Sequence, residues 1–196
     1  DKPMPFSSPG KIVFYGTSIT QGANASRPGL SYVNQIGRHF NIETLNLGFS
    51  GNGLGEAAII NIIKHIKDMK MLIIDYDANA GAKGTLYSTL EPLIKATRKV
   101  NPDIPIIVIS RIFYILETYK PNVKAAMSKR RSFQKELVES LDDNNLYYID
   151  GQSLLPDEPF DCFSDQIHLN DLGFYFFSQN LIKYIEQVWK HKGVEK

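Results

Sequence analysis

The sequence has little cysteine and no strong charge imbalance. Cys162 is the one cysteine among 196 residues, so an intrachain disulfide is impossible and a cysteine-rich zinc site is excluded. This leaves the compartment open, because many secreted proteins fold without disulfides. Lys and Arg number 22 and Asp and Glu number 21, for a net charge of +1. This balance gives no general attraction to nucleic acid or to an anionic membrane, and no apolar run approaches the roughly 20 residues of a membrane-spanning helix.

The composition is that of a globular domain. Hydrophobic residues make up 43% of the chain and charged residues 22%, which excludes a disordered tail and a collagen-like fibre. A chain of this length buries roughly 70% of its unfolded surface and needs no covalent staples. No internal repeat or long linker divides it. We therefore expect a single domain over residues 1–196, with residues 1–10 as a lead-in segment.

Short apolar runs alternate with longer amphipathic segments along the chain. This alternation predicts an α/β protein, a three-layer sandwich in which helices cover both faces of a five-stranded parallel sheet. In the predicted helix 54–67, Ile59, Ile62, Ile63 and Ile66 lie on one face. In such sheets, ligands bind outside the carboxyl ends of the strands. The predicted strands are 11–16, 44–48, 71–74, 105–109 and 146–149, and the predicted helices are 30–40, 54–67, 86–100, 122–141 and 171–189.

Two glycine-rich segments follow the first two predicted strands. Ser18 lies in Gly16–Gly22, which has neither the lysine of a phosphate loop nor the G-x-S-x-G pattern of a nucleophile elbow. By itself, such a serine is most often a turn or a helix cap. Gly51 lies in the segment 48–55, whose backbone N–H groups could hold an oxyanion or could form only a tight turn.

Polar side chains follow the third and fifth predicted strands. Asp75, Asp77 and Asn79 come directly after the third strand and could be ordinary solvated loop residues. Asp165 and His168 have the i, i+3 spacing that lets a carboxylate accept the Nδ1–H of a histidine, although a local ion pair has the same spacing. A nucleophile, an oriented base and hydrogen-bond donors at one sheet edge are the components of acyl transfer.

Taken together and in this order, the motifs resemble the SGNH hydrolases, the GDSL-type esterase and lipase family, and in particular a bacterial subgroup of GDSL-like lipases and acylhydrolases. GTSITQG resembles the first family block, with Thr17 where the family has Asp. Gly51 matches the glycine of the second block, Asn79 the asparagine of the third, and Asp165-Gln-Ile-His168 the last block. The third block departs from the family, because Asp77 replaces its glycine and Ala80 replaces its aspartate.

The resemblance implies a flavodoxin-like SGNH fold and a role for each matched residue. Ser18 is expected to be the nucleophile, His168 the general base and Asp165 the group that orients it. The N–H groups of Ser18 and Gly51 and the amide of Asn79 are expected to form the oxyanion hole. No metal and no organic cofactor are expected. The subgroup often carries a signal peptide and an extra N-terminal domain, which favours a periplasmic or secreted protein, with a cytoplasmic one still open.

The substrate-binding residues are expected to be Arg111, Asp77 and Arg27. Arg111 follows the fourth strand, where it could bind a substrate carboxylate or sugar hydroxyls, or pair with Asp75 or Asp77. The polar loop 23–29 is expected to form a rim of the pocket. These features favour a short-chain acyl esterase, with acetyl groups on carbohydrates as the substrates. A lipase or thioesterase, and a ligand-binding module that has lost catalysis, remain the alternatives.

The expected partners follow from this function. They are a small-molecule or carbohydrate ester and no nucleic acid, and the oligomeric state stays open. Six basic residues between Lys120 and Lys135, with no acid among them, are expected to form a solvated helix face.

Overall fold

The computed structural model describes residues 4–191, and its centre is a five-stranded parallel sheet in the order β2-β1-β3-β4-β5. This confirms the predicted α/β architecture. The first strand begins within the expected lead-in 1–10, whose first three residues lie outside the described part of the chain. The strands are β1 (Ser8–Gly16), β2 (Ile42–Gly48), β3 (Met69–Asp75), β4 (Ile106–Ile109) and β5 (Leu146–Ile149).

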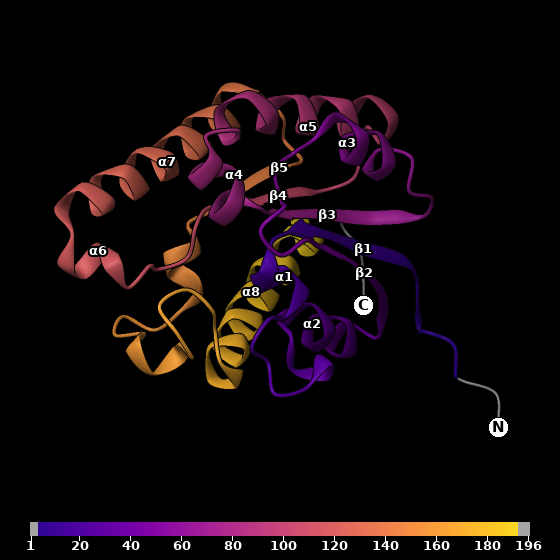
Figure 1. Ribbon diagram of the computed structural model, residues 1–196. Helices are drawn as coiled ribbons and strands as arrows, with labels where there is room; N and C mark the ends of the chain where they lie inside the picture. The colour runs from indigo at the N-terminus through magenta and orange to yellow at the C-terminus, as the bar shows by residue number, and fades with distance from the viewer. Residues whose placement is uncertain (1–3, 192–196) are drawn as a thin grey trace.

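Helices cover both faces of this sheet, so the molecule has three layers (Figure 1). Successive side chains of a strand point to opposite faces. In β1, Ile12 and Phe14 pack with the helices of one face, and Val13 and Tyr15 pack with those of the other. One face is covered by α2 (Tyr32–Phe40) and α8 (Asp171–His191), and the other by α3 (Ala57–Ile63), α5 (Leu86–Val100) and α7 (Pro121–Ser140).

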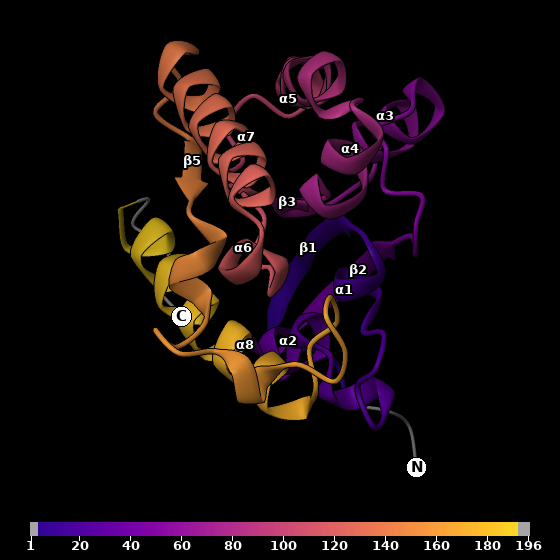
Figure 2. The ribbon, with the colours of Figure 1, turned by 60° about the vertical axis from the view of Figure 1, so that its left-hand side comes forward.

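Several short helices lie at the carboxyl ends of the strands, where the sequence pattern did not predict them. Each has too few residues to show a helical period. Figure 2 shows α4 and α7 on the same side of the sheet, and the loop that precedes α8 reaching toward α1. The short helices are α1 (Ser18–Gln21), α4 (Asp77–Lys83) and α6 (Leu116–Tyr119), and the 3-10 turns are η1 (Pro28–Leu30), η2 (Gly151–Leu154) and η3 (Phe160–Cys162).

The predicted helix 54–67 is wrong in length and in its buried face. The helix α3 spans Ala57–Ile63 only, because the segment before it is held as a loop by a 2.8 Å hydrogen bond from Gly55 N to the Tyr15 hydroxyl. Ile63 is fully buried, whereas its neighbour Ile62 is 55% exposed. A run of isoleucines therefore did not define a single buried face.

The last helix packs on the sheet through an apolar stripe. In α8, the stripe formed by Phe174, Phe177, Leu181 and Ile185 is fully buried against the sheet. Within residues 4–191, no helix is both long enough and apolar enough to cross a bilayer.

Candidate active site

Ser18 lies at the first position of α1, directly after β1, and is 7% exposed. A capping box holds this turn: Thr20 Oγ1 accepts from the Thr17 N–H at 3.3 Å, and the Thr17 side chain accepts from the helix backbone. The turn also requires Gly16. A Cβ atom there would lie 1.9 Å from Thr20 Oγ1 and 2.5 Å from the Asp75 carbonyl oxygen. The turn that places Ser18 at the edge of the sheet therefore forms only because Gly16 has no side chain.

The structure brings Ser18 and His168 together across 150 positions of sequence, with Ser18 Oγ 3.0 Å from His168 Nε2. Asp165 Oδ2 lies 2.7 Å from His168 Nδ1, and Asp165 Oδ1 accepts the N–H groups of Ile167 and His168 at 2.6 Å. Desolvation raises the pKa of Asp165, but the hydrogen bonds from His168 and Ile167 outweigh it and lower the value to about 2. The ionised carboxylate accepts the Nδ1–H, which leaves Nε2 to accept the Ser18 hydroxyl proton.

The loop 23–29 supports the histidine loop rather than lining the pocket. Asn24 Nδ2 donates to Ser164 Oγ at 2.8 Å and to Asp165 Oδ2 at 3.4 Å, and the Ser26 N–H donates to Asp171 Oδ1 at 2.9 Å. No residue of this loop lines the cavity beside Ser18. The expectation that the loop forms a rim of this cavity is therefore wrong, and so is the place expected for Arg27, which is exposed outside it.

The three expected oxyanion-hole donors, the N–H groups of Ser18 and Gly51 and the amide of Asn79, lie at one edge of the sheet. Gly51 has a φ of +71°, a conformation that favours glycine. The Gly53 N–H donates to Asn79 Oδ1 at 3.2 Å, which orients the Asn79 amide. Among the described residues, no acceptor takes the N–H of Ser18 or of Gly51, or the Asn79 amide N–H. All three groups belong to residues that line one cavity with His168.

This cavity has a volume of about 630 Å³, within the usual range for small-molecule sites. Arg111 and Tyr114 line it after β4, and α7 adds Met127, Lys129 and Arg130. The contribution of α7 was missed from the sequence, where its basic residues were interpreted as a solvated face. Among residues 4–191, no three His, Cys, Asp or Glu side chains gather as metal ligands do.

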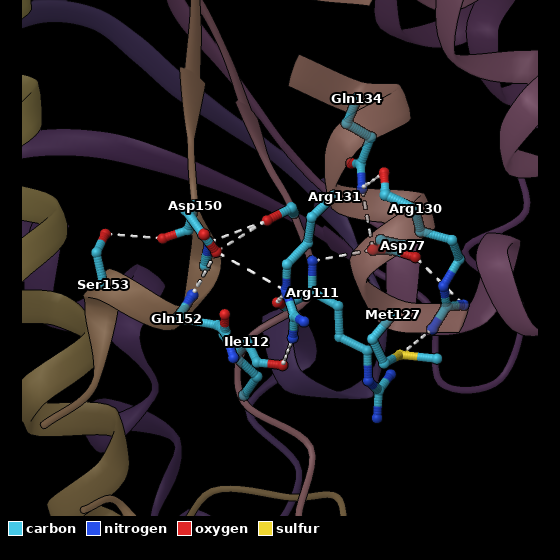
Figure 3. A network of polar contacts seen from close by, with 12 residues as sticks. Asp77, Arg111, Ile112, Met127, Arg130, Arg131, Gln134, Asp150, Gln152 and Ser153 are labelled. Atoms are coloured by element: carbon cyan, nitrogen blue, oxygen red, sulfur yellow. Dashed lines mark hydrogen bonds and ion pairs between the residues drawn. The ribbon is translucent and has the colours of Figure 1, made fainter. Parts of the chain in front are cut away.

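Asp77 does not reach this cavity, so its expected role in substrate binding is wrong. Its side chain is fully buried and points toward Gln134 and Arg130 (Figure 3). Asp77 Oδ2 accepts the Arg111 N–H at 2.9 Å and the Gln134 Nε2–H at 3.0 Å, and Oδ1 lies 3.3 Å from Arg130 Nη1. Gly81 leaves room for this contact, because a Cβ there would lie 2.0 Å from Arg130 Nη1. The aspartate that departs from the family pattern therefore ties α4 to β4 and α7.

The predicted solvated face of the basic helix is also wrong at two positions. Arg130 and Arg131 are only 5% and 8% exposed. Arg131 Nη1 and Nη2 each donate to the Glu117 carboxylate at 2.8 Å, and Arg131 Nε donates to the Arg111 carbonyl oxygen at 3.2 Å. The sequence spacing could not show this, because the carboxylate partners lie on other helices, Glu117 on α6 and Asp77 on α4.

A second buried carboxylate, that of Asp75, is hydrogen-bonded to a side chain of α1. Asp75 Oδ2 accepts from Thr20 Oγ1 at 3.1 Å and from the Tyr32 hydroxyl at 3.0 Å. Burial raises the pKa of Asp75 to about 7, although both hydrogen bonds oppose this rise. Neither Asp75 nor Asp77 forms an ion pair with Arg111 within the described residues.

Comparison with known proteins agrees with the family resemblance of the sequence motifs. The profile of the GDSL-like lipase/acylhydrolase family matches residues 10–186. A structure described as a GDSL-like lipase from Bacteroides ovatus has a TM-score of 0.85 and 30% identity, over 96% of this chain and 55% of that one. The chain therefore spans only about half of that relative. No curated protein matches the sequence.

Two further solved structures share the fold. A family two carbohydrate esterase from Clostridium thermocellum, solved with cellohexaose, has a TM-score of 0.71 and 16% identity, over 95% of this chain and 66% of that one. A lipase/acylhydrolase from Enterococcus faecalis has a TM-score of 0.70 and 18% identity, over 90% of this chain and 95% of that one. At these identities the likeness concerns the fold alone.

Proposed function

We propose that this chain, which belongs to the GDSL-like lipase/acylhydrolase family, is a carboxylic ester hydrolase. It removes short acyl groups, acetyl above all, from carbohydrate-type esters through an acyl-enzyme on Ser18. The observation that carries the proposal is the hydrogen-bonded chain from Ser18 Oγ through His168 to Asp165, with links of 3.0 and 2.7 Å. We propose that residues 1–196 form one catalytic domain.

In the first half-reaction, Ser18 Oγ attacks the ester carbonyl carbon while His168 Nε2 takes the hydroxyl proton. The tetrahedral intermediate carries a negative oxygen, which the N–H groups of Ser18 and Gly51 and the Asn79 amide stabilise. One such donor is typically worth about 10²–10³ in kcat. His168 then returns the proton to the leaving alkoxide, and the acyl group stays on Ser18. Asp165 holds the Nδ1–H throughout and stabilises the imidazolium.

In the second half-reaction, a water molecule attacks the acyl carbonyl carbon and gives its proton to His168 Nε2. Collapse of the intermediate breaks the bond to Ser18 Oγ, which regains the proton from His168. The products are the free carboxylic acid and the original enzyme, so no co-reactant besides water is needed.

The preference for short acyl groups on carbohydrates rests on the cavity and on the fold relatives. The cavity is lined in part by the polar side chains of Ser50, Arg111 and Lys129, which can form hydrogen bonds with the hydroxyls of a sugar. The Clostridium thermocellum esterase that shares the fold was solved with cellohexaose. Aromatic side chains such as Tyr114 also suit the apolar face of a sugar ring.

A specific observation favours a second candidate, a lipase or thioesterase with a longer acyl group. Tyr87, Met127 and Ile167 line the same cavity as Ser18. Apolar walls of this kind gain about 0.8 kcal/mol for each buried methylene. The two candidates therefore differ in how activity changes with the length of the acyl chain.

A series of 4-nitrophenyl esters from acetate to octanoate, with the Ser18→Ala variant as the control, distinguishes them. We expect kcat/KM to be highest for acetate and to fall as the chain lengthens, and Ser18→Ala to lose at least about 10³-fold in kcat. A steady rise toward octanoate would establish the second candidate. Wild-type activity equal to that of Ser18→Ala would contradict both and would indicate a ligand-binding module without catalysis.

A further inference from the structure

The guanidinium of Arg111 is a buried cation without a hydrogen-bonding partner. Arg111 is 7% exposed, and no described residue accepts a hydrogen bond from its guanidinium. Its Nε atom is buried and unpaired. Figure 3 shows the side chain extending away from Asp77, whose carboxylate instead binds the Arg111 backbone N–H and Arg130. A buried charge of this kind is costly unless an anion compensates it.

The surrounding contacts hold Arg111 in a fixed position. Its N–H donates to Asp77 Oδ2 at 2.9 Å, and its carbonyl oxygen accepts from Arg131 Nε at 3.2 Å. The guanidinium carbon lies 4.4 Å from the centre of the Tyr114 ring. The backbone is therefore fixed on both sides, and stacking orients the planar head group. Little conformational freedom remains to be lost when a ligand binds.

The cavity around this guanidinium is positively charged. Arg111, Lys129 and Arg130 line it together with Ser18 and His168. No Asp or Glu belongs to the described residues that line it, and Asp77 is already engaged by Arg130 behind the wall. Burial lowers the pKa of Arg111, and the nearby Asp77 partly offsets this. An anionic group entering the cavity would meet a desolvated cation that no described carboxylate pairs with directly.

From this geometry we infer that Arg111 binds a carboxylate of the substrate, so that the enzyme acts on acetyl esters of acidic sugars such as uronates. The inference rests on the proposed function, since it places the carboxylate on the alcohol part of the ester that Ser18 cleaves. A guanidinium presents two parallel N–H donors that match the two oxygens of one carboxylate. The other buried arginine of the cavity wall, Arg130, is already paired with Asp77, so the one guanidinium left unpaired among the described residues of this wall suits this monoanion better than a phosphate dianion.

Two pairs of esters, each compared with and without a carboxylate, test the inference. The first pair is 4-acetoxybenzoate and its neutral methyl ester, which places the carboxylate on the alcohol side. The second pair is 4-nitrophenyl hydrogen glutarate and 4-nitrophenyl pentanoate, which places it on the acyl side. We expect the wild type to favour 4-acetoxybenzoate at least tenfold in kcat/KM, mainly through KM, and to show no such preference in the second pair.

Variants assign this preference to Arg111. Arg111→Gln should lower the charged-to-neutral ratio of kcat/KM at least tenfold, and Arg111→Lys should give an intermediate ratio. Lys124→Gln removes an exposed charge from α7 outside the cavity and should leave the ratio within twofold. Equal rates for 4-acetoxybenzoate and its methyl ester in the wild type, or a ratio that survives in Arg111→Gln, would overturn the inference. A preference confined to the acyl-side pair would overturn its assignment to the alcohol part.

A binding measurement separates this inference from the proposed function. Calorimetry with the Ser18→Ala variant should show that glucuronate binds at least tenfold more tightly than glucose, and that adding Arg111→Gln removes the difference. If the neutral esters are cleaved in a Ser18-dependent way but glucuronate has no advantage, only the carboxylate site is wrong. If no ester is cleaved but the glucuronate preference holds and depends on Arg111, the proposed function is wrong and the carboxylate site at Arg111 stands.

Discussion

Asp165 and Asp77 both position groups at the cavity, but in opposite surroundings. The Asp165 side chain is 47% exposed, and its ring partner His168 lies three positions away in the sequence. Asp77 is fully buried, and it accepts from the backbone N–H of Arg111, 34 positions away, and from the side chain of Gln134, 57 positions away. Asp165 serves one histidine, whereas Asp77 joins α4, the end of β4 and α7.

Because Asp165 is exposed and Asp77 is buried, the two carboxylates should contribute to different properties, Asp165 to catalysis and Asp77 to stability. Water can solvate the groups left behind when an exposed carboxylate is removed, so the loss is confined to the group it oriented. A buried carboxylate leaves a charged partner without compensation, and that cost falls on the folded state as a whole. We therefore expect substitutions at Asp165 to change kcat and substitutions at Asp77 to change the free energy of unfolding.

The largest expected effect is that of Asp165→Asn on turnover. The amide can no longer accept the Nδ1–H of His168 as a carboxylate does, so the ring loses its orientation and the imidazolium its stabilisation. We expect kcat on 4-nitrophenyl acetate to fall about 10³–10⁴-fold. The melting temperature should stay within about 3 °C of the wild type, as measured by circular dichroism. A kcat within tenfold of the wild type would break the comparison.

At the buried site, Asp77→Ala should destabilise the protein by about 3–5 kcal/mol, because it leaves the Arg130 guanidinium buried and unpaired. The free energy of unfolding in urea measures this. Asp77→Asn is the matched control: it keeps an oxygen to accept the Arg111 N–H and should lose less. If Asp77→Ala unfolds at the same urea concentration as the wild type, the buried network does not stabilise the fold.

Asn79 lies between these two cases, since it lines the cavity but also accepts the Gly53 N–H. Asn79→Ala should lower kcat about 10–10³-fold and cost about 1 kcal/mol of stability through the lost hydrogen bond. The exposed neighbour Asn52, changed to Ala, serves as the control and should keep nearly full turnover. Unchanged turnover in Asn79→Ala would mean that Asp77 and Ala80 mark a differently built oxyanion site.

The most gradual expected effect is a pH dependence of stability that has opposite signs for two carboxylates. The folded-state pKa of Asp75 is raised to about 7, above the usual value of about 4 in an unfolded chain. As the pH rises, the unfolded chain releases this proton before the folded protein does. The free energy of unfolding therefore falls as the pH rises from about 4 to about 7, by at most about 1.4 kcal/mol per pH unit. The pKa of Asp165 is lowered to about 2, so its contribution is lost instead as the pH falls from about 4 to about 2.

Urea unfolding of the wild type and of Asp75→Asn between pH 4.5 and 7.5 measures the first of these slopes. The variant cannot ionise at position 75, so its free energy of unfolding should decline less than that of the wild type over this range. Parallel curves would show that Asp75 does not titrate within it.

Local pattern explains what could be predicted. The apolar runs gave all five strands and the order of the layers, because a strand buried on both faces must be apolar along its length. The block containing Asp165 and His168 could be recognised because both residues lie within one turn. Ser18 and Gly51 follow neighbouring parallel strands, so their place at one edge followed from the topology.

Long-range packing explains what could not be predicted. Nothing in the spacing of Lys120–Lys135 distinguishes the buried Arg130 and Arg131 from their exposed neighbours, since their partners are brought in by other elements. The same holds for Asp77, whose place in the motif indicated the pocket but whose side chain turns into the protein.

The sequence by itself determined the α/β sandwich, the edge of the sheet where chemistry is expected, and the residues expected to carry it. Only the tertiary structure decided which charges are compensated. It paired Asp77 with Arg130 and Arg131 with Glu117, and it placed Arg111 at the cavity with no acceptor for its guanidinium among residues 4–191. The physical reason is that desolvation and pairing depend on which side chains meet across the fold, and a linear pattern of residue types does not contain that information.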